Sequence, residues 1–404
     1  MEPKSLRILF VGMPDSVHTA RWINQVANLG WDLHLFSSNP GPAHTDFRNL
    51  TIYNLSSSRP AGLHKSVRLK GLWPSRIGVE RLSLKTSYGK WLARVIRRVK
   101  PDIVHSMEIQ RAGYMTAAAK SEFDGNFPRW IVSNWGSDIY LFGRLAAHRP
   151  RIEEVLASCD YYHCECHRDA QLAKDYGLRG EALPVFPVTG GFDIERKREL
   201  CQPGATSGRR VVALKGYQNW AGRALVGLRA VELCADQLRN YRVVVYMPGD
   251  DVKIAAEIVA QSTGLNIEFD TKHWRRDDIL RMHGQARISI GLSITDAIST
   301  SLLEAMIMGS FPVQSNTGCG DEWLVDGETG LLVPPNDPEP VAAAIRTALA
   351  DDRLVDNAAA KNLQLAYERL DTSVIKPKVI EMYQMISEAG HKSGMSAGST
   401  ARRK

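Results

Sequence analysis

The sequence has no run of about 18 residues that is apolar enough to span a bilayer, so we expect no membrane-spanning helix. It also lacks a recognisable secretory leader. The apolar run at 6–12 is too short for the core of a signal peptide, and no cleavage site of small residues follows it. With 44% hydrophobic and 24% charged residues, the composition is that of an ordinary soluble globular protein. We therefore expect a cytoplasmic protein.

Cysteine is also scarce. The six residues have no spacing typical of a disulfide framework, which indicates a reducing compartment. They are Cys159, Cys164, Cys166, Cys201, Cys234 and Cys319.

One short segment, 163–167 (HCECH), has the composition of a metal site. It falls at the end of a predicted strand, where neighbouring side chains point to opposite faces and five of them cannot converge on one ion. No second cluster of ligands is visible. The sequence therefore predicts no metal ion and no other cofactor.

The 404 residues are enough for two domains, each with its own core. Strand and helix patterns alternate throughout, which predicts α/β domains with parallel sheets covered on both faces. Strands are predicted at 7–12, 31–36, 50–55, 102–107, 130–134, 160–164, 210–216, 241–247, 267–270, 288–292 and 311–315. Helices are predicted at about 17–29, 84–99, 111–121, 147–157, 167–176, 223–238, 250–263, 341–349, 354–370 and 373–387.

Proline and glycine cluster between 183 and 209, so we place a domain linker near 195–208. The first domain then covers 1–197 and the second 208–371. The tail at 390–404 is rich in Gly, Ser, Lys and Arg, which predicts disorder.

The most informative segment begins at Asp296. It continues through the turn Ser299, Thr300 and Ser301 into an apolar helix that carries Glu304. A helix N-terminus presents free backbone N–H groups and a positive dipole end, which suit a phosphate. A carboxylate one or two turns further on can accept hydrogen bonds from a ribose. The segment therefore predicts a pocket for a nucleotide diphosphate with a sugar attached.

Three runs in this region, 304–306 (EAM), 309–313 (GSFPV) and 326–335 (DGETGLLVPP), resemble the signature of the family 4 retaining glycosyltransferases, which have the GT-B fold. That signature has two Glu residues separated by seven positions. Asp296 stands where the first Glu is usual. Because Asp is one methylene shorter, the pocket must close slightly or use a water.

The resemblance implies two Rossmann-like domains that face a central cleft, with the acceptor on the first and the nucleotide sugar on the second. It also implies a helix at 372–389 that crosses back to the first domain, and a retaining transfer that needs no metal. Glu304 would hold the ribose hydroxyls, the turn after Asp296 the phosphates, and Asp296 itself the hydroxyls of the donor sugar.

A leaving diphosphate gains negative charge, so fixed cations are expected beside it. The family has an Arg at the end of the first strand of the second domain and a Lys a few residues later. In this sequence Lys215 ends the strand, Arg223 follows, and Ala221 stands where the Lys is usual. We expect Lys215 and Arg223 to form the pair. The resemblance also places His273 and Trp274 near the base.

The first domain carries weaker signals. Gly12 ends the first strand, where a glycine lets a ligand approach the backbone closely. The run 15–22 (DSVHTARW) resembles the opening of the family's first domain, although a plain helix start is an alternative. Asp138 follows another strand and is a good helix N-cap as well as a site candidate. The acceptor or cleft candidates are His18, Arg21, Trp135, Gly136 and Asp138.

Positive charge is concentrated at 64–100. The segment has eleven basic residues and one acid, Glu80, so it carries +10 against a net +7 for the whole sequence and leaves −3 for the rest. A basic segment that contains Trp73 and Trp91 is typical of contact with an anionic membrane surface. The alternative is a solvated face of an ordinary helix at 84–99. Nucleic acid is not expected, because no reader motif accompanies the charge. The basic residues are Lys65, Arg68, Lys70, Arg76, Arg81, Lys85, Lys90, Arg94, Arg97, Arg98 and Lys100.

These features predict a retaining glycosyltransferase that moves a sugar from a nucleotide-diphosphate sugar to a glycan or lipid-linked acceptor in cell-envelope polysaccharide assembly, at the inner face of the membrane. Two alternatives remain open: a nucleotide-sugar epimerase of the same fold, and a nucleotide-sugar-binding protein with weak or no turnover.

Overall fold

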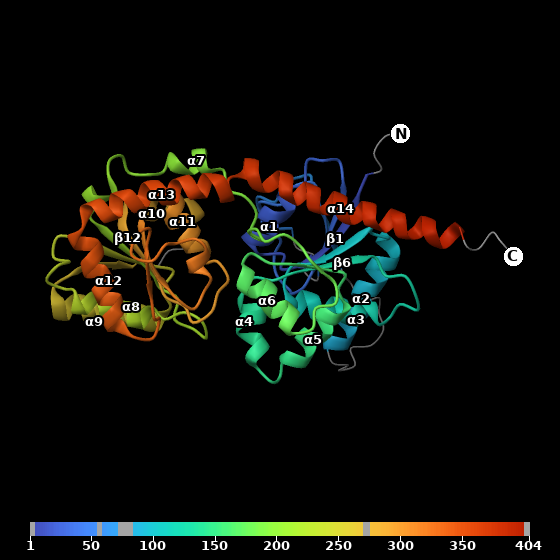
Figure 1. Ribbon diagram of the computed structural model, residues 1–404, viewed down its shortest axis with the longest axis horizontal. Helices are drawn as coiled ribbons and strands as arrows, with labels where there is room; N and C mark the ends of the chain where they lie inside the picture. The colour runs from blue at the N-terminus through green and yellow to red at the C-terminus, as the bar shows by residue number, and fades with distance from the viewer. Residues whose placement is uncertain (1–4, 55–58, 72–83, 270–274, 400–404) are drawn as a thin grey trace. The chain divides into compact units, whose positions relative to one another are not determined.

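The computed structural model describes residues 5–54, 59–71, 84–269 and 275–399 (Figure 1). His273 and Trp274, predicted near the base, lie outside these residues. The chain forms two compact units. The first combines Met1–Gly191 with Ser373–Lys404, and the second is Phe192–Thr372.

The chain enters and leaves the second unit along paired backbone. Phe192 N–H donates to the Leu370 carbonyl at 2.9 Å, and Thr372 N–H donates to the Phe192 carbonyl at 2.8 Å. The stretch predicted as a linker, 195–208, includes η3 (Thr206–Gly208) and most of α7 (Ile194–Arg198), and both belong to the second unit.

The first unit is built on a parallel sheet with the strand order β4-β3-β2-β1-β5-β6-β7-β8. Strand β1 shows why both faces of this sheet are covered. Ile8 and Phe10 join one apolar cluster, and Leu9 and Val11 join another on the opposite face. The strands are β1 (Arg7–Gly12), β2 (Asp32–Ser37), β3 (Thr51–Asn54), β4 (Arg68–Gly71), β5 (Ile103–Ser106), β6 (Arg129–Ser133), β7 (Tyr161–His163) and β8 (Glu181–Ala182).

Helices cover this sheet, and amphipathic α2 shows how. Leu92, Val95 and Ile96 are buried, whereas Lys90 and Arg94 on the other side of the helix are exposed. The helical segments are α1 (Val17–Asn24), α2 (Leu84–Val99), the π-helix η1 (Ile109–Gly113), α3 (Tyr114–Lys120), α4 (Ser137–Tyr140), η2 (Phe142–Arg144), α5 (Arg149–Ser158), α6 (His167–Asp175) and α14 (Thr372–Ser399).

Helix α14 completes the core of the first unit and runs beside α1 (Figure 1). Within its buried stripe, the Tyr383 hydroxyl accepts a hydrogen bond from Trp22 Nε1 at 2.8 Å and lies 2.6 Å from His105 Nδ1. Satisfied polar groups in a core fix the position of the elements that carry them. The stripe consists of Ile375, Val379, Met382, Tyr383 and Ile386.

The same helix extends to Ser399, although composition predicts disorder from residue 390. Once the packed part has formed, each further residue adds one helical hydrogen bond at little cost. The last part of the predicted tail, 400–404, lies outside the described residues. Among the residues that the structure describes, no helix has the length and apolarity needed to cross a bilayer.

The second unit contains a parallel sheet with the order β11-β10-β9-β12-β13-β14. Its strands are β9 (Val211–Lys215), β10 (Arg242–Tyr246), β11 (Asn266–Phe269), β12 (Ala286–Gly291), β13 (Phe311–Ser315) and β14 (Leu331–Val333). Besides α7 and η3, its helices are α8 (Ala224–Leu233), α9 (Asp250–Thr263), α10 (Arg276–Gln285), α11 (Thr300–Met308), η4 (Gly320–Glu322), α12 (Pro338–Ala350) and α13 (Asp352–Leu370).

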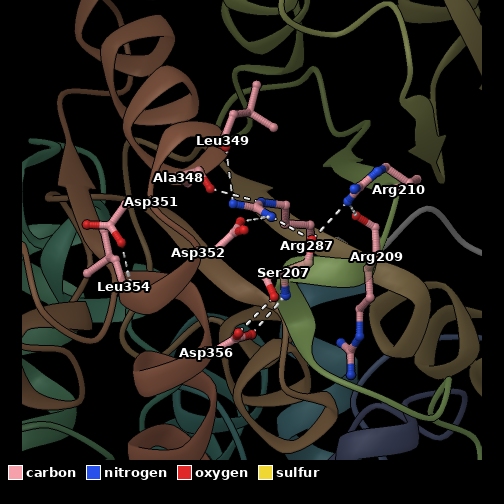
Figure 2. Close-up of polar contacts among 10 residues, drawn as sticks. All are labelled: Ser207, Arg209, Arg210, Arg287, Ala348, Leu349, Asp351, Asp352, Leu354 and Asp356. Carbon is pink, nitrogen blue, oxygen red and sulfur yellow. Dashed lines mark hydrogen bonds and ion pairs between the residues drawn. The ribbon is translucent and has the colours of Figure 1, made fainter.

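A buried arginine joins several of these elements at the start of β12 (Figure 2). Arg287 is 1% exposed and donates hydrogen bonds to the carbonyls of Ser207, Ala348 and Leu349, at 2.6, 2.9 and 3.2 Å respectively. It also pairs with Asp352 at 2.7 Å. The guanidinium therefore holds η3 and the junction of α12 with α13 against the sheet, at the opposite end of β12 from the loops described next.

Candidate functional site

The strand order of the second unit marks where a ligand is expected. β9 and β12 are neighbours, but the chain leaves them toward opposite edges of the sheet, which makes a switch point at their carboxyl ends. The loops that follow are joined there. Arg223 N–H donates to the Leu292 carbonyl at 3.1 Å, and Ile294 N–H donates to the Ala221 carbonyl at 2.9 Å.

Helix α11 begins beside this point and carries Glu304. Ser299 is its N-cap, and Gly309, with φ at 71°, ends it in the left-handed region. The first backbone hydrogen bond of the helix comes from Leu302 N–H to the Ser299 carbonyl at 2.9 Å, so the N–H groups of Thr300 and Ser301 precede the hydrogen-bonded ladder. The predicted turn is therefore a helix start with donors available for an anion.

Glu304 is 7% exposed and lies among tyrosines. Burial raises the pKa of Tyr217, and the Glu304 carboxylate raises it further. Burial raises the pKa of Tyr246 as well; the hydrogen bond with Ser301 opposes this, and Glu304 adds to it. Tyr246 ends β10 and is the register partner of Lys215 on β9. Its hydrogen bond with Ser301, one helical turn before Glu304, places this part of α11 beside the ends of the two strands.

Lys215 is on the same side. It is the last residue of β9, half-buried, with Nζ 4.7 Å from the centre of the Tyr217 ring. Burial first and the Lys215 charge second lower the pKa of His283 to about 3, so the imidazole near this cation is neutral at pH 7. The structure thus brings Lys215 and Glu304 to one neighbourhood around Tyr217.

The sequence predicts that Arg223 binds the diphosphate, whereas in the structure its side chain is hydrogen-bonded within the protein. Its Nη1 donates to the carbonyls of Gly222 at 2.8 Å and Asn219 at 3.2 Å, and its Nε donates to Asn336 Oδ1 at 3.0 Å. These contacts tie down the loop between β9 and α8. A direct role beside Lys215 stays a prediction.

Asp296 lies in the loop after β12. Its carboxylate accepts a hydrogen bond from Ala297 N–H at 3.0 Å. A Cβ on Gly318 would lie 3.2 Å from the Ala297 carbonyl and 3.5 Å from the Asp296 Cβ, so glycine lets the loop after β13 approach this side chain closely. A longer acid at position 296 would have to fit against that loop.

A basic residue that the sequence reasoning did not single out also faces Glu304. Arg276 is the first residue of α10, and its Nε lies 3.9 Å from Glu304 Oε1. The sequence held one usable signal, the acidic pair Asp277 and Asp278, which is typical of a first helical turn. The helix itself is not among those that periodicity predicts.

In the first unit, the switch point lies between β1 and β5. Gly12 ends β1, and a Cβ there would lie 3.3 Å from the Met107 Cβ and 3.6 Å from Thr19 Cγ2, so the glycine permits close packing at this edge. His18 lies in α1, and its ring contacts that of Trp135 edge-on with centroids 5.8 Å apart. Two of the candidates, far apart in the chain, therefore contact each other, and their role in binding an acceptor stays a prediction.

Arg21 and Gly136 have identifiable structural roles. The Arg21 carbonyl accepts a hydrogen bond from Gln25 Nε2 at 3.2 Å, and its side chain lies under Gly190. Gly136 has φ at 91°, which favours glycine at the start of α4.

Asp138 and Glu108 form a pair of buried carboxyl groups at this edge. Asp138 accepts hydrogen bonds from Ile109 N–H at 3.0 Å and Trp135 N–H at 3.2 Å, and burial raises its pKa to about 6. Burial and then Asp138 raise the pKa of Glu108 to about 7, while Ser38 donates a hydrogen bond to Glu108 at 3.1 Å. Sequence reasoning missed Glu108, because its partners Ser38 and Asp138 are distant in sequence.

Comparisons with known proteins match both parts of the chain to glycosyltransferase families. Residues 7–164 match the family described as glycosyl transferase 4-like, and residues 210–351 match glycosyl transferases group 1. A phosphatidyl-myo-inositol mannosyltransferase of Mycolicibacterium smegmatis is 35% identical over 95 residues, which is 24% of this chain and 24% of that protein.

Two solved structures share the fold. Sucrose-phosphate synthase from Thermosynechococcus elongatus superimposes with a TM-score of 0.72 at 14% identity, over 95% of this chain and 100% of the other. HepE of Anabaena in complex with UDP-glucose gives a TM-score of 0.67 at 15% identity, over 94% and 99% of the two chains.

Proposed function

This chain belongs to the group 1 glycosyltransferases and has the GT-B fold, as predicted, and we propose that it moves a sugar from a nucleotide-diphosphate sugar to a glycan or lipid-linked acceptor in cell-envelope polysaccharide assembly. The observation that carries the proposal is the placement of Lys215 and Glu304 at the switch point of the second sheet, where Lys215 pairs in register with Tyr246 and Tyr246 hydrogen-bonds to Ser301, one helical turn before Glu304. A cation and a carboxylate at the same edge of the sheet suit a ligand with a phosphate at one end and hydroxyl groups at the other.

In the proposed reaction, Lys215 stabilises the charge that grows on the leaving diphosphate, which is where fixed positive charge lowers a barrier most. The N–H groups at the start of α11, around Ser299, Thr300 and Ser301, bind the phosphates. Glu304 accepts hydrogen bonds from the ribose, and Asp296 contacts the transferred sugar. Arg223 shapes the phosphate loop and adds positive charge to it.

We further propose that the transfer keeps the anomeric configuration and needs no metal ion. The donor's own phosphate takes the proton from the acceptor hydroxyl, and Lys215 supplies the charge that a metal would otherwise provide. The acceptor binds to the first unit, near the pair His18 and Trp135, and Gly12 contributes to binding of the nucleotide sugar. The enzyme works in the cytoplasm and reaches its acceptor by peripheral contact with the membrane.

The first test is a panel of nucleotide sugars scored by the shift in melting temperature. One donor is expected to give the largest shift, and Glu304→Ala should abolish it. Incubation of that donor without acceptor then separates an enzyme from a binding protein, because a transferase slowly hydrolyses its donor. Conversion of the donor to an epimer, without release of sugar, would favour the epimerase. A panel without any shift would contradict the proposal.

A further inference from the structure

The guanidinium of Arg276 lacks the partners that a buried arginine normally has. Its Nε and Nη2 are buried, yet they donate no hydrogen bond to any residue that the structure describes. The side chain is 29% exposed and lies over Phe192, with Cζ 5.5 Å from the ring centre. Nearly all buried N–H groups in proteins are hydrogen-bonded, so unpaired ones indicate a missing partner.

Glu304 faces Arg276 and lacks hydrogen-bond donors. Its side chain is 10% exposed, and its carboxylate accepts no hydrogen bond from any described residue. The separation of 3.9 Å between Arg276 Nε and Glu304 Oε1 is too long for a hydrogen bond between them. An unsatisfied donor and an unsatisfied acceptor therefore lie side by side without forming a hydrogen bond.

The charges restrict what can fill this place. A phosphate would be attracted to Arg276 but repelled by Glu304. An ammonium group would be attracted to Glu304 but repelled by Arg276. A hydroxyl group suits both, because its O–H donates to the carboxylate while its lone pairs accept from the guanidinium. Two adjacent hydroxyls would use the two buried N–H groups and both carboxylate oxygens.

We propose that Arg276 is a specificity-determining residue that binds the ribose diol of the donor nucleotide jointly with Glu304. This assignment rests on the proposed function. The proposed function had Glu304 as the ribose ligand, and Arg276 on α10 is a second one. Arg276 would select ribonucleotides over nucleotides that lack the diol. Phe192 supports the guanidinium from below and limits its movement.

The test compares UDP with 2′,3′-dideoxy-UDP by calorimetry, or GDP with its dideoxy analogue if GDP binds more tightly. The wild-type chain is expected to prefer the ribonucleotide by about tenfold or more, because each lost hydroxyl leaves a charged group unpaired. Arg276→Met should weaken binding of the ribonucleotide and leave the affinity for the dideoxynucleotide almost unchanged. The ratio of the two affinities should then fall to a few-fold. Arg276→Lys keeps one cationic donor and should retain part of the ratio.

Arg275→Met is the matched control, since Arg275 is the preceding residue, 84% exposed and paired with Asp278. It should leave both affinities unchanged. If Arg276→Met weakens binding of the two nucleotides equally, the assignment is overturned, because Arg276 would then act on the diphosphate or through the fold. Should the methionine variant not fold, an unchanged ratio in Arg276→Lys would overturn it. A wild-type chain that binds neither UDP nor GDP would instead refute the proposed function itself.

Discussion

At the scale of single residues, Lys215 matters because it has no ion pair with an acidic residue in the described part of the chain, and its Nζ lies 4.7 Å from the centre of the Tyr217 ring. We predict that Lys215→Met lowers kcat by about 100-fold with the preferred donor, since the lost charge acts mainly on the diphosphate as it leaves. The affinity for the intact donor should change less, because the interaction strengthens in the transition state. Steady-state measurement of kcat and KM separates the two effects.

Lys253→Met is a control within the same unit, because Lys253 lies on α9 and pairs with the exposed Asp250. It should keep normal kcat and KM. A Lys215→Met enzyme with unchanged kcat would remove Lys215 from the proposed chemistry.

Glu108 is expected to make stability depend on pH. Its pKa is raised from 4.5 to about 7, by burial first and by Asp138 second. Between these values the folded chain holds a proton that the unfolded chain has lost, so the stability from this group is fully present below pH 4.5 and is lost as pH rises toward 7. Glu108→Gln cannot ionise and can still accept the hydrogen bond from Ser38.

The variant Glu108→Gln should therefore melt at a higher temperature than the wild type at about pH 8 and at nearly the same temperature at about pH 4. Melting curves recorded across this range test it. Glu154→Gln, at an exposed position on α5, should follow the wild type throughout. If Glu108→Gln lowers the melting temperature at pH 8, the folded chain tolerates the ionised carboxylate and the expected sign is wrong.

At the scale of elements, Arg287 connects β12 to three other segments of the second unit (Figure 2). Arg287→Met keeps a similar length but removes the donor from the carbonyls of Ala348 and Leu349, whereas Ser207 keeps its hydrogen bond from Arg210. We expect a loss of about 3 kcal/mol in the free energy of unfolding. Urea unfolding measures it. Asp352 is 72% exposed, so Asp352→Asn should cost under about 1 kcal/mol. Similar losses in both variants would mean that the ion pair, and not the carbonyls, supplies the stability.

Periodicity predicted the buried strands well, because their apolar runs and the polar turns between them are local features. β1 at Arg7–Gly12 and α2 at Leu84–Val99 coincide with the predicted ranges. Elements with a weak apolar pattern were missed, since it is their neighbours in the fold that stabilise them. β4 (Arg68–Gly71) has no buried residue and pairs with β3, and α10 has a mostly polar sequence and packs on α11.

The candidate site divides in the same way. Lys215 and Glu304 were found because each is tied to a local signal, a strand end and a helix start. Arg276 and Glu108 were not, because what distinguishes them is a partner distant in sequence: Glu304 for Arg276, and Ser38 and Asp138 for Glu108. Such pairs are created by the fold and leave no pattern along the chain.

At the scale of the whole molecule, the charge is unevenly distributed. The segment 64–100 carries +10, and the rest of the chain is slightly acidic. In the described part of this segment, α2 buries its apolar stripe in the first unit and leaves Lys90, Arg94 and Arg98 exposed. A basic face fixed on a folded unit acts on a charged surface as one body, and each charge adds about 1 kcal/mol near anionic lipid.

We therefore expect the chain to sediment with vesicles of phosphatidylglycerol, but not with vesicles of phosphatidylcholine, and to be released by high salt. Replacing Lys90, Arg94 and Arg98 with Gln should weaken binding by about 3 kcal/mol, or roughly 100-fold. The matched control replaces three basic residues of the second unit, Arg229, Arg239 and Lys253, which removes the same charge elsewhere. If both triple variants lose binding equally, only net charge matters. If neither triple variant loses binding, or if the wild type does not bind anionic vesicles, this face does not contact the membrane.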